Sequence, residues 1–447
     1  MRLKLLLVMA VVLVTSSGML FAQQRMQERE QEFLESKPLI GDPLPEVTVY
    51  AADGTPFKTS DLRGQYTVLT FGCLTCPPSI WNIAGLEAVE RDYGPQGVKF
   101  FFIFKALAHP ELAGDYVQPF TIDERLEQAR RAKQQFGTRI PWVVDAMDNR
   151  LKHALGDRPN AQFLVNPEGV IVRKRAWANP AQVRKDLEEL VGTVEHVTRE
   201  EDLRLALNLP PKSAAARGVV KRIARPQMLP IVLEPQIDPK GPEFFAKLRA
   251  EADADLLRSG AGKLYLGFHL DPLHNAHWNN LTKPLSFQIE KAAGVTLERW
   301  EVEAEKIAET SDSDPREFLL NVEAWPEDQP LKLVVKYFAC VGEETCHAVR
   351  QEYVIHRSRD ADGGGARGSG AGYWNPDDFA RQMMRSDANK DGKLTKAEVV
   401  GIALPHFEKL DANKDGFLEL EELKTIADWL NFHHQPGAPL KTSKPGQ

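Results

Sequence analysis

The chain has 447 residues, 27% of them charged, and a formal net charge of -7 at pH 7. A chain of this length exceeds what one hydrophobic core usually organises, so we expect about three domains. The mild negative charge argues against a nucleic-acid-binding surface, because such surfaces concentrate positive charge. The four cysteines form two close pairs, Cys73/Cys76 and Cys340/Cys346. This arrangement favours two local disulfides or dithiols over a framework that staples the whole fold.

Residues 1–22 have the pattern of a secretory signal peptide. Arg2 and Lys4 precede an apolar run from Leu5 to Val14, and Ala22 offers a cleavage site. An uncleaved anchor is the alternative, although the apolar run has only roughly half the length of a membrane-spanning helix. We therefore expect a secreted or periplasmic protein, which after processing is not an integral membrane protein and works where disulfides persist.

Residues 38–193 alternate between strand-like and helix-like patterns. The expected elements, in chain order, are a strand at 66–71, a helix at 77–93, a strand at 98–104, a helix at 122–136, a strand at 142–145, a hairpin of 161–165 with 170–173, and a helix at 180–191. Strands separated by crossover helices imply an α/β sheet, and the closing hairpin adds an antiparallel edge.

The pattern changes after this domain. Residues 194–259 predict a helical and Pro-rich connector, whereas 260–358 show alternating strands without long intervening helices, which favours an all-β, immunoglobulin-like sandwich. A Gly-rich linker at 359–373 then isolates a C-terminal module at 374–432, and 433–447 form a flexible tail.

The C-terminal module contains two matches to the calcium-loop pattern D-x-[DN]-x-[DN]-G-x5-E. In such EF-hand loops, side chains at positions 1, 3, 5 and 12 and the carbonyl group at position 7 supply oxygen ligands, and glycine at position 6 makes the turn. The expected calcium ligands are Asp387, Asn389, Asp391, Lys393 and Glu398 in the first loop, and Asp411, Asn413, Asp415, Phe417 and Glu422 in the second.

Two further features describe how the calcium loops pair. Leu394 and Leu418 occupy position 8, where short strands would join the loops back to back. Only residues 399–410 separate the loops, a short spacing that resembles dockerin-type modules. The resemblance implies a compact, rigid pair with a structural or docking role.

Cys73-Leu74-Thr75-Cys76 follows a buried strand and leads into a helix, as a thioredoxin-like redox site requires. Proline is favoured at the first helical position, so Pro77 makes Cys76 the N-cap residue, where helix amides stabilise a thiolate. On that geometry Cys76 attacks and Cys73 resolves the mixed disulfide. If the helix began at Leu74 instead, Cys73 would be the attacking cysteine. A structural disulfide and a zinc site are the alternatives, although zinc would need ligands that the sequence does not place nearby.

Two other features support a working thiol pair. Ile140-Pro141 precedes a strand, where thioredoxin-like folds place a cis-proline against the active site, and His109 lies just beyond a strand end. A surface histidine is the alternative interpretation of His109.

These residues carry a family likeness. The stretch FGCLTCPPS, from Phe71 to Ser79, resembles the iodothyronine deiodinase motif, with Cys76 at the selenocysteine position. The stretch IFKALAHPEL is similar to that family's Ala-His-Pro segment, and the resemblance implies a functional role for His109. The stretch IPWVVDAMDN and the hairpin after it are also similar. The likeness spans about residues 38–191, but this chain has sulfur in place of selenium and gains Cys73.

The second cysteine pair lies at the ends of two predicted strands that flank a short loop, so a hairpin staple is one interpretation. Residues 263–357 also resemble the disulfide-bond-corrector domain of bacterial thiol reductases, which implies a redox role for Cys340 and Cys346. Three histidines in 269–278 could bind a metal, although solvated histidines are the simpler interpretation.

The sequence thus predicts a multidomain protein with a thioredoxin-like α/β domain, an immunoglobulin-like sandwich and an α-helical EF-hand pair that binds calcium. The preferred function is thiol-disulfide exchange with a redox partner protein or a small thiol. Reductive dehalogenation of the deiodinase type is an alternative, and so is a calcium-stabilised extracellular scaffold with structural cystines.

Overall fold

The computed structural model describes residues 30–108, 110, 116–203, 205, 219–220, 223, 226–342, 345–363, 380, 383–387, 389, 391–399 and 407–431. The chain divides into two compact units: residues 1–105, 129–207 and 374–429 belong to the first, and 106–128, 208–373 and 430–447 to the second. Within the described ranges, no helix is both long enough and apolar enough to cross a membrane. The predicted signal peptide and tail lie outside the described residues.

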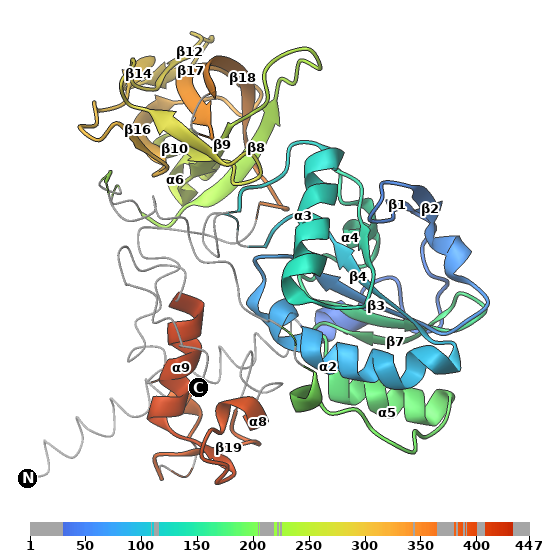
Figure 1. The fold of residues 1–447 in the computed structure, drawn as a ribbon. Helices are drawn as coiled ribbons and strands as arrows, with labels where there is room; N and C mark the ends of the chain where they lie inside the picture. Colours follow the sequence, from blue (N-terminus) through green and yellow to red (C-terminus); the bar gives the residue numbers. More distant parts are fainter. Residues whose placement is uncertain are drawn as a thin grey trace, which may run out of the picture. The chain divides into compact units, whose positions relative to one another are not determined.

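The first unit contains a seven-stranded mixed sheet with the order β2-β1-β5-β4-β3-β6-β7 (Figure 1). The strands are β1 (Thr48–Tyr50), β2 (Pro56–Lys58), β3 (Thr67–Gly72), β4 (Lys99–Phe104), β5 (Trp142–Val144), β6 (Gln162–Val165) and β7 (Ile171–Arg175). Strand β4 runs parallel to both β3 and β5, whereas β6 and β7 are antiparallel. The α/β sheet with an antiparallel edge is therefore confirmed.

Helices cover both faces of this sheet, and every residue of β3 is buried as a result. The helices are α2 (Pro77–Tyr93), α3 (Ile122–Phe136), α4 (Arg150–Ala154) and α5 (Pro180–Leu190). Helices α2 and α5 lie side by side (Figure 1). On the other face, Leu151 of α4 and Leu155, which follows the helix directly, share an apolar cluster with Phe33, Phe71 and Phe163.

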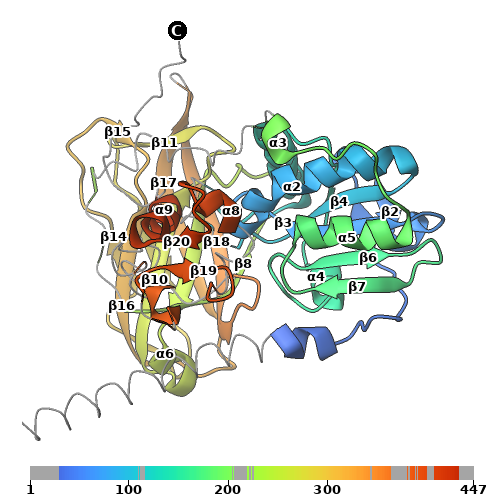
Figure 2. The same ribbon diagram turned by 90° about the horizontal axis from the view of Figure 1, so that it is seen from below.

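The second unit is built around antiparallel strands that extend into two connected sheets. The elements are β8 (Leu229–Pro235), β9 (Ala246–Ala252), α6 (Ala254–Ser259), β10 (Gly262–Leu270), β11 (Ala276–Asn279), β12 (Ser286–Ile289), β13 (Thr296–Leu297), β14 (Glu301–Glu303), β15 (Ser311–Asp312), β16 (Arg316–Ala324), β17 (Leu331–Val341) and β18 (Thr345–Arg359). Strand β8 joins the two sheets, because it pairs with β9 in one and with β18 in the other. The long strands β17 and β18 run side by side (Figure 2). The β character is confirmed, and the immunoglobulin-like assignment stays a prediction.

The predicted connector at 194–259 is wrong in its second half, because β8, β9 and α6 belong to the β unit. Strand β9 pairs with β10 over its whole length and is buried throughout. Because β9 contains several charged residues, the sequence did not indicate a buried strand there. Lys247 donates to Asp271 at 2.5 Å and Arg249 donates to Glu251 at 2.5 Å, so these buried charges are paired.

The predicted boundary of the α/β domain also changes, because residues 106–128 join the second unit. Phe120 of this segment packs edge-on against Phe244 and Tyr353 of the β core. Glu124 lies 2.8 Å from the ammonium group of Lys247. Through the ring contacts of Phe120 and the ion pair of Glu124, the segment packs as part of the β core.

The C-terminal module contains η5 (Met384–Ser386), β19 (Leu394–Thr395), α8 (Phe407–Leu410), β20 (Phe417–Leu418) and α9 (Leu420–Asn431). Strands β19 and β20 are antiparallel, with Leu394 opposite Leu418. The predicted back-to-back pairing of the two loops is therefore confirmed.

Candidate functional site

The first cysteine pair lies at the carboxyl end of the parallel strands. Strand β3 ends at Gly72, and α2 begins at Pro77, with Cys76 as an extended N-cap residue (φ -100°, ψ 106°). In α/β sheets this edge is where ligands and reacting groups gather, because the strands end together and helices begin there. The predicted start of the helix is confirmed.

Cys73 and Cys76 are not joined in a disulfide, and both are buried, with 0% and 2% exposure. The Cys76 thiol hydrogen-bonds Cys73, and the Cys73 sulfur lies 3.5 Å from the Thr75 hydroxyl. The pKa of Cys76 is raised well above its usual value, first by the hydrogen bond with Cys73, then by burial and by the negative charge of Cys73. Burial and the neighbouring sulfur therefore favour the protonated form of Cys76.

This direction is opposite to the one that helix capping predicted for the pKa of Cys76, and the order in which the two sulfurs attack stays a prediction. The helix does begin at Pro77, and a hydrogen bond from Ser79 and the positive charge of Lys105 both lower the pKa of Cys76. These effects are smaller than those of burial and of the neighbouring sulfur. The physical reason is that Cys73 lies so close that only one of the two sulfurs can easily carry negative charge.

Two other predicted features of the redox site have different outcomes. His109 lies outside the described residues, so its role stays a prediction. The only cis peptide bond of the described ranges is Lys37–Pro38, so the expected cis bond at Ile140–Pro141 is wrong. Trans is the default even before proline, since cis is the higher-energy isomer there.

The residue that does reach the cysteine helix is Asn160, which the sequence did not single out. Its side-chain nitrogen donates to the carbonyl oxygen of Phe71 at 2.8 Å and to the hydroxyl of Ser79 at 3.1 Å. Asn160 lies just before β6 and is completely buried. A polar residue next to an apolar strand was the only available signal, and many surface turns give the same signal.

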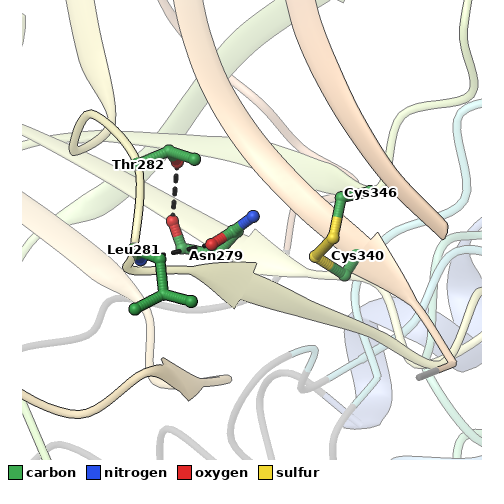
Figure 3. The surroundings of a disulfide bond; sticks show 5 residues. All are labelled: Asn279, Leu281, Thr282, Cys340 and Cys346. Carbon is green, nitrogen blue, oxygen red and sulfur yellow. Dashed lines mark hydrogen bonds between the residues drawn. A yellow bond between two sulfur atoms is a disulfide. The ribbon is translucent and has the colours of Figure 1, made fainter. Parts of the chain in front are cut away.

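The second cysteine pair is a disulfide. Cys340 and Cys346 face each other across β17 and β18, with their Cα atoms 3.9 Å apart. Figure 3 shows the bond linking the two strands, near the turn in which Thr282 donates to the Asn279 carbonyl oxygen at 2.8 Å. Cys340 is buried and Cys346 is exposed. The pair therefore closes the hairpin at its turn.

The two calcium loops share the turn at position 6 and its hydrogen bond to position 1. At position 6, Gly392 and Gly416 adopt left-handed backbone conformations, with φ of 83° and 86°. Their amides donate to Asp387 and Asp411 at position 1, each over 2.9 Å. Glycine tolerates this conformation, and the turn points the side chains of positions 1, 3 and 5 inward.

The donor chemistry of the loops fits calcium. Carboxylate and amide oxygens from positions 1, 3, 5 and 12 are hard ligands of the kind that calcium prefers. In the second loop, Glu422 accepts hydrogen bonds from the Ala412 and Glu419 amides, each over 2.9 Å, which ties position 12 to both ends of the loop. The residues predicted as ligands therefore form loops of suitable composition and turn geometry.

Lys393 adds a contact between the loops that the sequence did not predict. Its carbonyl group was expected to bind calcium in the first loop, but its ammonium group lies 3.1 Å from Asp415 and 2.5 Å from Glu419 of the second loop. The pKa of Lys393 is raised by its hydrogen bonds with Glu419 and Asp415. A cation from one loop thus occupies part of the ligand set of the other.

The histidines of 269–278 offer little to a metal. Of these, only His274 belongs to a group of potential ligands in the described part of the chain, together with Glu124 and Asp271. The Lys247 ammonium already lies 2.8 Å and 2.5 Å from those two carboxylates. The cation at this position is the lysine.

Comparisons with known proteins describe parts of the chain. A family model described as "EF hand" matches residues 406–427, which include the second calcium loop. No curated protein matches the chain. One similar solved structure is the thioredoxin domain of a thiol-disulfide oxidoreductase from Bacteroides vulgatus, with 18% identity, 34% of this chain and 97% of that chain covered, and a TM-score of 0.26. Another is a thiol:disulfide interchange protein from a Bacteroides species, with 18% identity, 35% and 92% covered, and a TM-score of 0.28.

Proposed function

We propose that the protein is a secreted or periplasmic thiol-disulfide oxidoreductase whose working pair is Cys73 and Cys76. The observation that carries the proposal is the pairing of these two buried cysteines at the carboxyl end of parallel strands, close enough for each sulfur to affect the other.

In the proposed reaction Cys73 leads and Cys76 resolves. The Cys73 thiolate attacks one sulfur of a substrate disulfide, forms a mixed disulfide and releases the other substrate sulfur as a thiolate. Cys76 then loses its proton, and its sulfur attacks Cys73. The Cys73–substrate bond breaks, the second substrate thiolate leaves, and the protein holds a Cys73–Cys76 disulfide. Two electrons have moved from the pair to the substrate.

The substrate class follows from the chemistry of the pair, namely a redox partner protein or a small thiol in its disulfide form. Both sulfurs are buried, so exchange requires the covering side chains to move aside. The positive charge of Lys105, which is itself 2% exposed, lies close enough to lower the pKa of Cys76. It would also stabilise the negative charge that passes along the two sulfurs during exchange.

Trapping of the mixed disulfide tests this order. Cys76→Ser is treated with 5,5′-dithiobis(2-nitrobenzoate), and the adduct is located by peptide mass spectrometry; Cys73→Ser is the matched control. We expect a stable adduct on Cys73 in the first variant and much slower labelling of Cys76 in the second. Faster labelling of Cys76 in Cys73→Ser would contradict the assigned order.

Reductive dehalogenation is the second candidate, because Cys76 lies directly before Pro77 and Pro78 at the helix start, as in the motif that it resembles. The candidate assigns attack on iodine to Cys76 and proton donation to His109. It predicts iodide release from an iodinated phenol that disappears in Cys76→Ser. Absence of iodide release with excess dithiol would leave disulfide exchange as the function.

The C-terminal module is proposed to bind calcium through the ten predicted ligands, which would stabilise the module by linkage. Extracellular calcium modules commonly bind at roughly 0.1 to 1 mM. If the whole protein were only a calcium-stabilised scaffold, the trapping experiment would yield no adduct on Cys73, although calcium would still raise the melting temperature.

A further inference from the structure

The segment that carries the two cysteines is held at both of its ends by one buried side chain. Asn160, which is 0% exposed, donates from its amide nitrogen to the Phe71 carbonyl oxygen at 2.8 Å and to the Ser79 hydroxyl at 3.1 Å. Phe71 lies in β3, two residues before Cys73. Ser79 lies in the first turn of α2, three residues after Cys76. One amide group thus bridges the strand that leads into the segment and the helix that leads out of it.

Two further contacts bring the same two ends together. The Ser79 hydroxyl donates a long hydrogen bond to the Phe71 carbonyl oxygen, at 3.5 Å. A Cβ atom added at Gly72 would lie 3.2 Å from the Trp142 ring and 3.6 Å from the Cβ atom of Ser79. Glycine allows this close approach without displacing the ring, so the start of α2 packs directly on the end of β3.

Asn160 is itself fixed in one orientation. Its amide oxygen accepts from Asn82 at 3.2 Å, and its backbone carbonyl oxygen accepts from the Ala178 amide at 2.8 Å. The reverse orientation of the side chain would place its oxygen against the Phe71 carbonyl oxygen, which has no hydrogen to offer. Buried polar groups are costly unless they are satisfied, so this arrangement is tightly specified.

A fixed spacing of the two ends matters for the second half of disulfide exchange. That step is intramolecular, so its rate depends on how often the sulfur of Cys76 comes within reach of Cys73, which can be expressed as an effective concentration. Residues 73–76 lie between β3 and α2 and belong to neither element. Tying the ends of such a short segment together leaves it fewer arrangements and raises the effective concentration.

We propose that Asn160 is a positioning residue for the exchange reaction, because it ties the end of β3 to the start of α2 and so keeps Cys76 within reach of Cys73. The proposal rests on the proposed exchange at these two cysteines and deepens it. In the resolving step Cys76 releases its proton to solvent and its sulfur bonds to Cys73. The substrate then leaves as a thiolate with the electron pair of the broken bond. Asn160 speeds this step and not the first attack, which comes from outside the segment.

Stopped-flow release of thionitrobenzoate separates the two steps. Reaction of Cys73 with dithiobis(nitrobenzoate) gives a first phase, and attack of Cys76 on the mixed disulfide releases the second thionitrobenzoate. In Asn160→Ala we expect an unchanged first phase and a resolving phase that is about tenfold slower, which is the scale of one lost hydrogen bond. In a glutathione titration the effective concentration should fall by the same factor, which raises the reduction potential of the pair by about 30 mV.

Gln162→Ala is the matched control. Gln162 is also a buried amide, with 0% exposure, and it donates to the Thr70 hydroxyl at 3.0 Å, before the cysteine segment begins. This variant loses a buried hydrogen bond to β3, as Asn160→Ala does, but it should resolve at the wild-type rate. Asn82→Ala, which frees the amide oxygen of Asn160, should slow the resolving phase by less than Asn160→Ala, and it carries the test if Asn160→Ala does not fold.

The possible outcomes distinguish this inference from the proposed function. A resolving phase in the folded Asn160 and Asn82 variants that matches Gln162→Ala would overturn the positioning role and leave exchange intact. Equal slowing of both phases would overturn it too, because it would indicate a general disturbance of the site. A wild-type protein that lacks the first phase would instead overturn the proposed function.

Discussion

Removal of the Cys340–Cys346 disulfide should weaken the β unit by an amount that can be calculated from the length of its loop. The two cysteines are separated by 6 positions in the sequence. In the chain-entropy description, closing a loop of this size costs the unfolded chain about 7.4 cal/mol/K, which is about 2 kcal/mol at 25 °C. Strands β17 and β18 already pair on both sides of the bond, so little native structure should be lost.

The measurement is guanidinium unfolding of the Cys340→Ala/Cys346→Ala double variant, followed by amide hydrogen exchange of peptides from β17 and β18. We expect the free energy of unfolding of this unit to fall by about 2 kcal/mol. Cys73→Ser/Cys76→Ser, made as a matched control, should leave the exchange of these peptides unchanged. If amide hydrogen exchange of the β17 and β18 peptides were the same with and without the disulfide, the stabilising role of the Cys340–Cys346 bond would be refuted. Reduction of the bond at the same potential as Cys73/Cys76 would favour an internal relay of electrons.

Three further predictions concern other parts of the fold. Lys393→Met should raise the calcium affinity of the second loop about two- to fivefold by removing a competing cation, whereas Lys396→Met should not, and titration calorimetry distinguishes them. Gly85→Ala should lower the free energy of unfolding by about 1 to 3 kcal/mol, because an added Cβ would lie 2.6 Å from the Pro180 ring; a more stable variant in urea would contradict this packing. Asp145→Ala should cost about 1 to 3 kcal/mol, because Asp145 accepts three backbone amides, and Asp145→Asn should cost less; equal losses by thermal melting would argue against the role of its charge.

The elements that the sequence located well are those whose pattern and boundary signals agree. The helix at 122–136 has this extent in α3, and α2 begins at Pro77 and ends at Tyr93. Amphipathic spacing and a proline at the helix start are local signals, so they can be read from one chain. The calcium loops were identified for the same reason, because each loop is a self-contained pattern.

The elements that were missed depend on contacts between distant residues. Strand β9 reads as charged, but its lysine and arginine are buried in ion pairs. Phe120 belongs to the β core only because the chain folds back onto it. The pKa of Cys76 is raised by the neighbouring Cys73 sulfur and by burial, and helix capping alone does not reveal either effect.

The reduction potential of Cys73/Cys76 tests the central claim most directly. The calcium-loaded protein is equilibrated in thiol redox buffers, and free thiols are trapped and quantified by mass spectrometry, with Cys340→Ala/Cys346→Ala used to isolate the first pair. A working thiol pair predicts a potential between about -120 and -270 mV. A potential below about -300 mV would mark a structural cystine and would contradict a role in thiol-disulfide exchange.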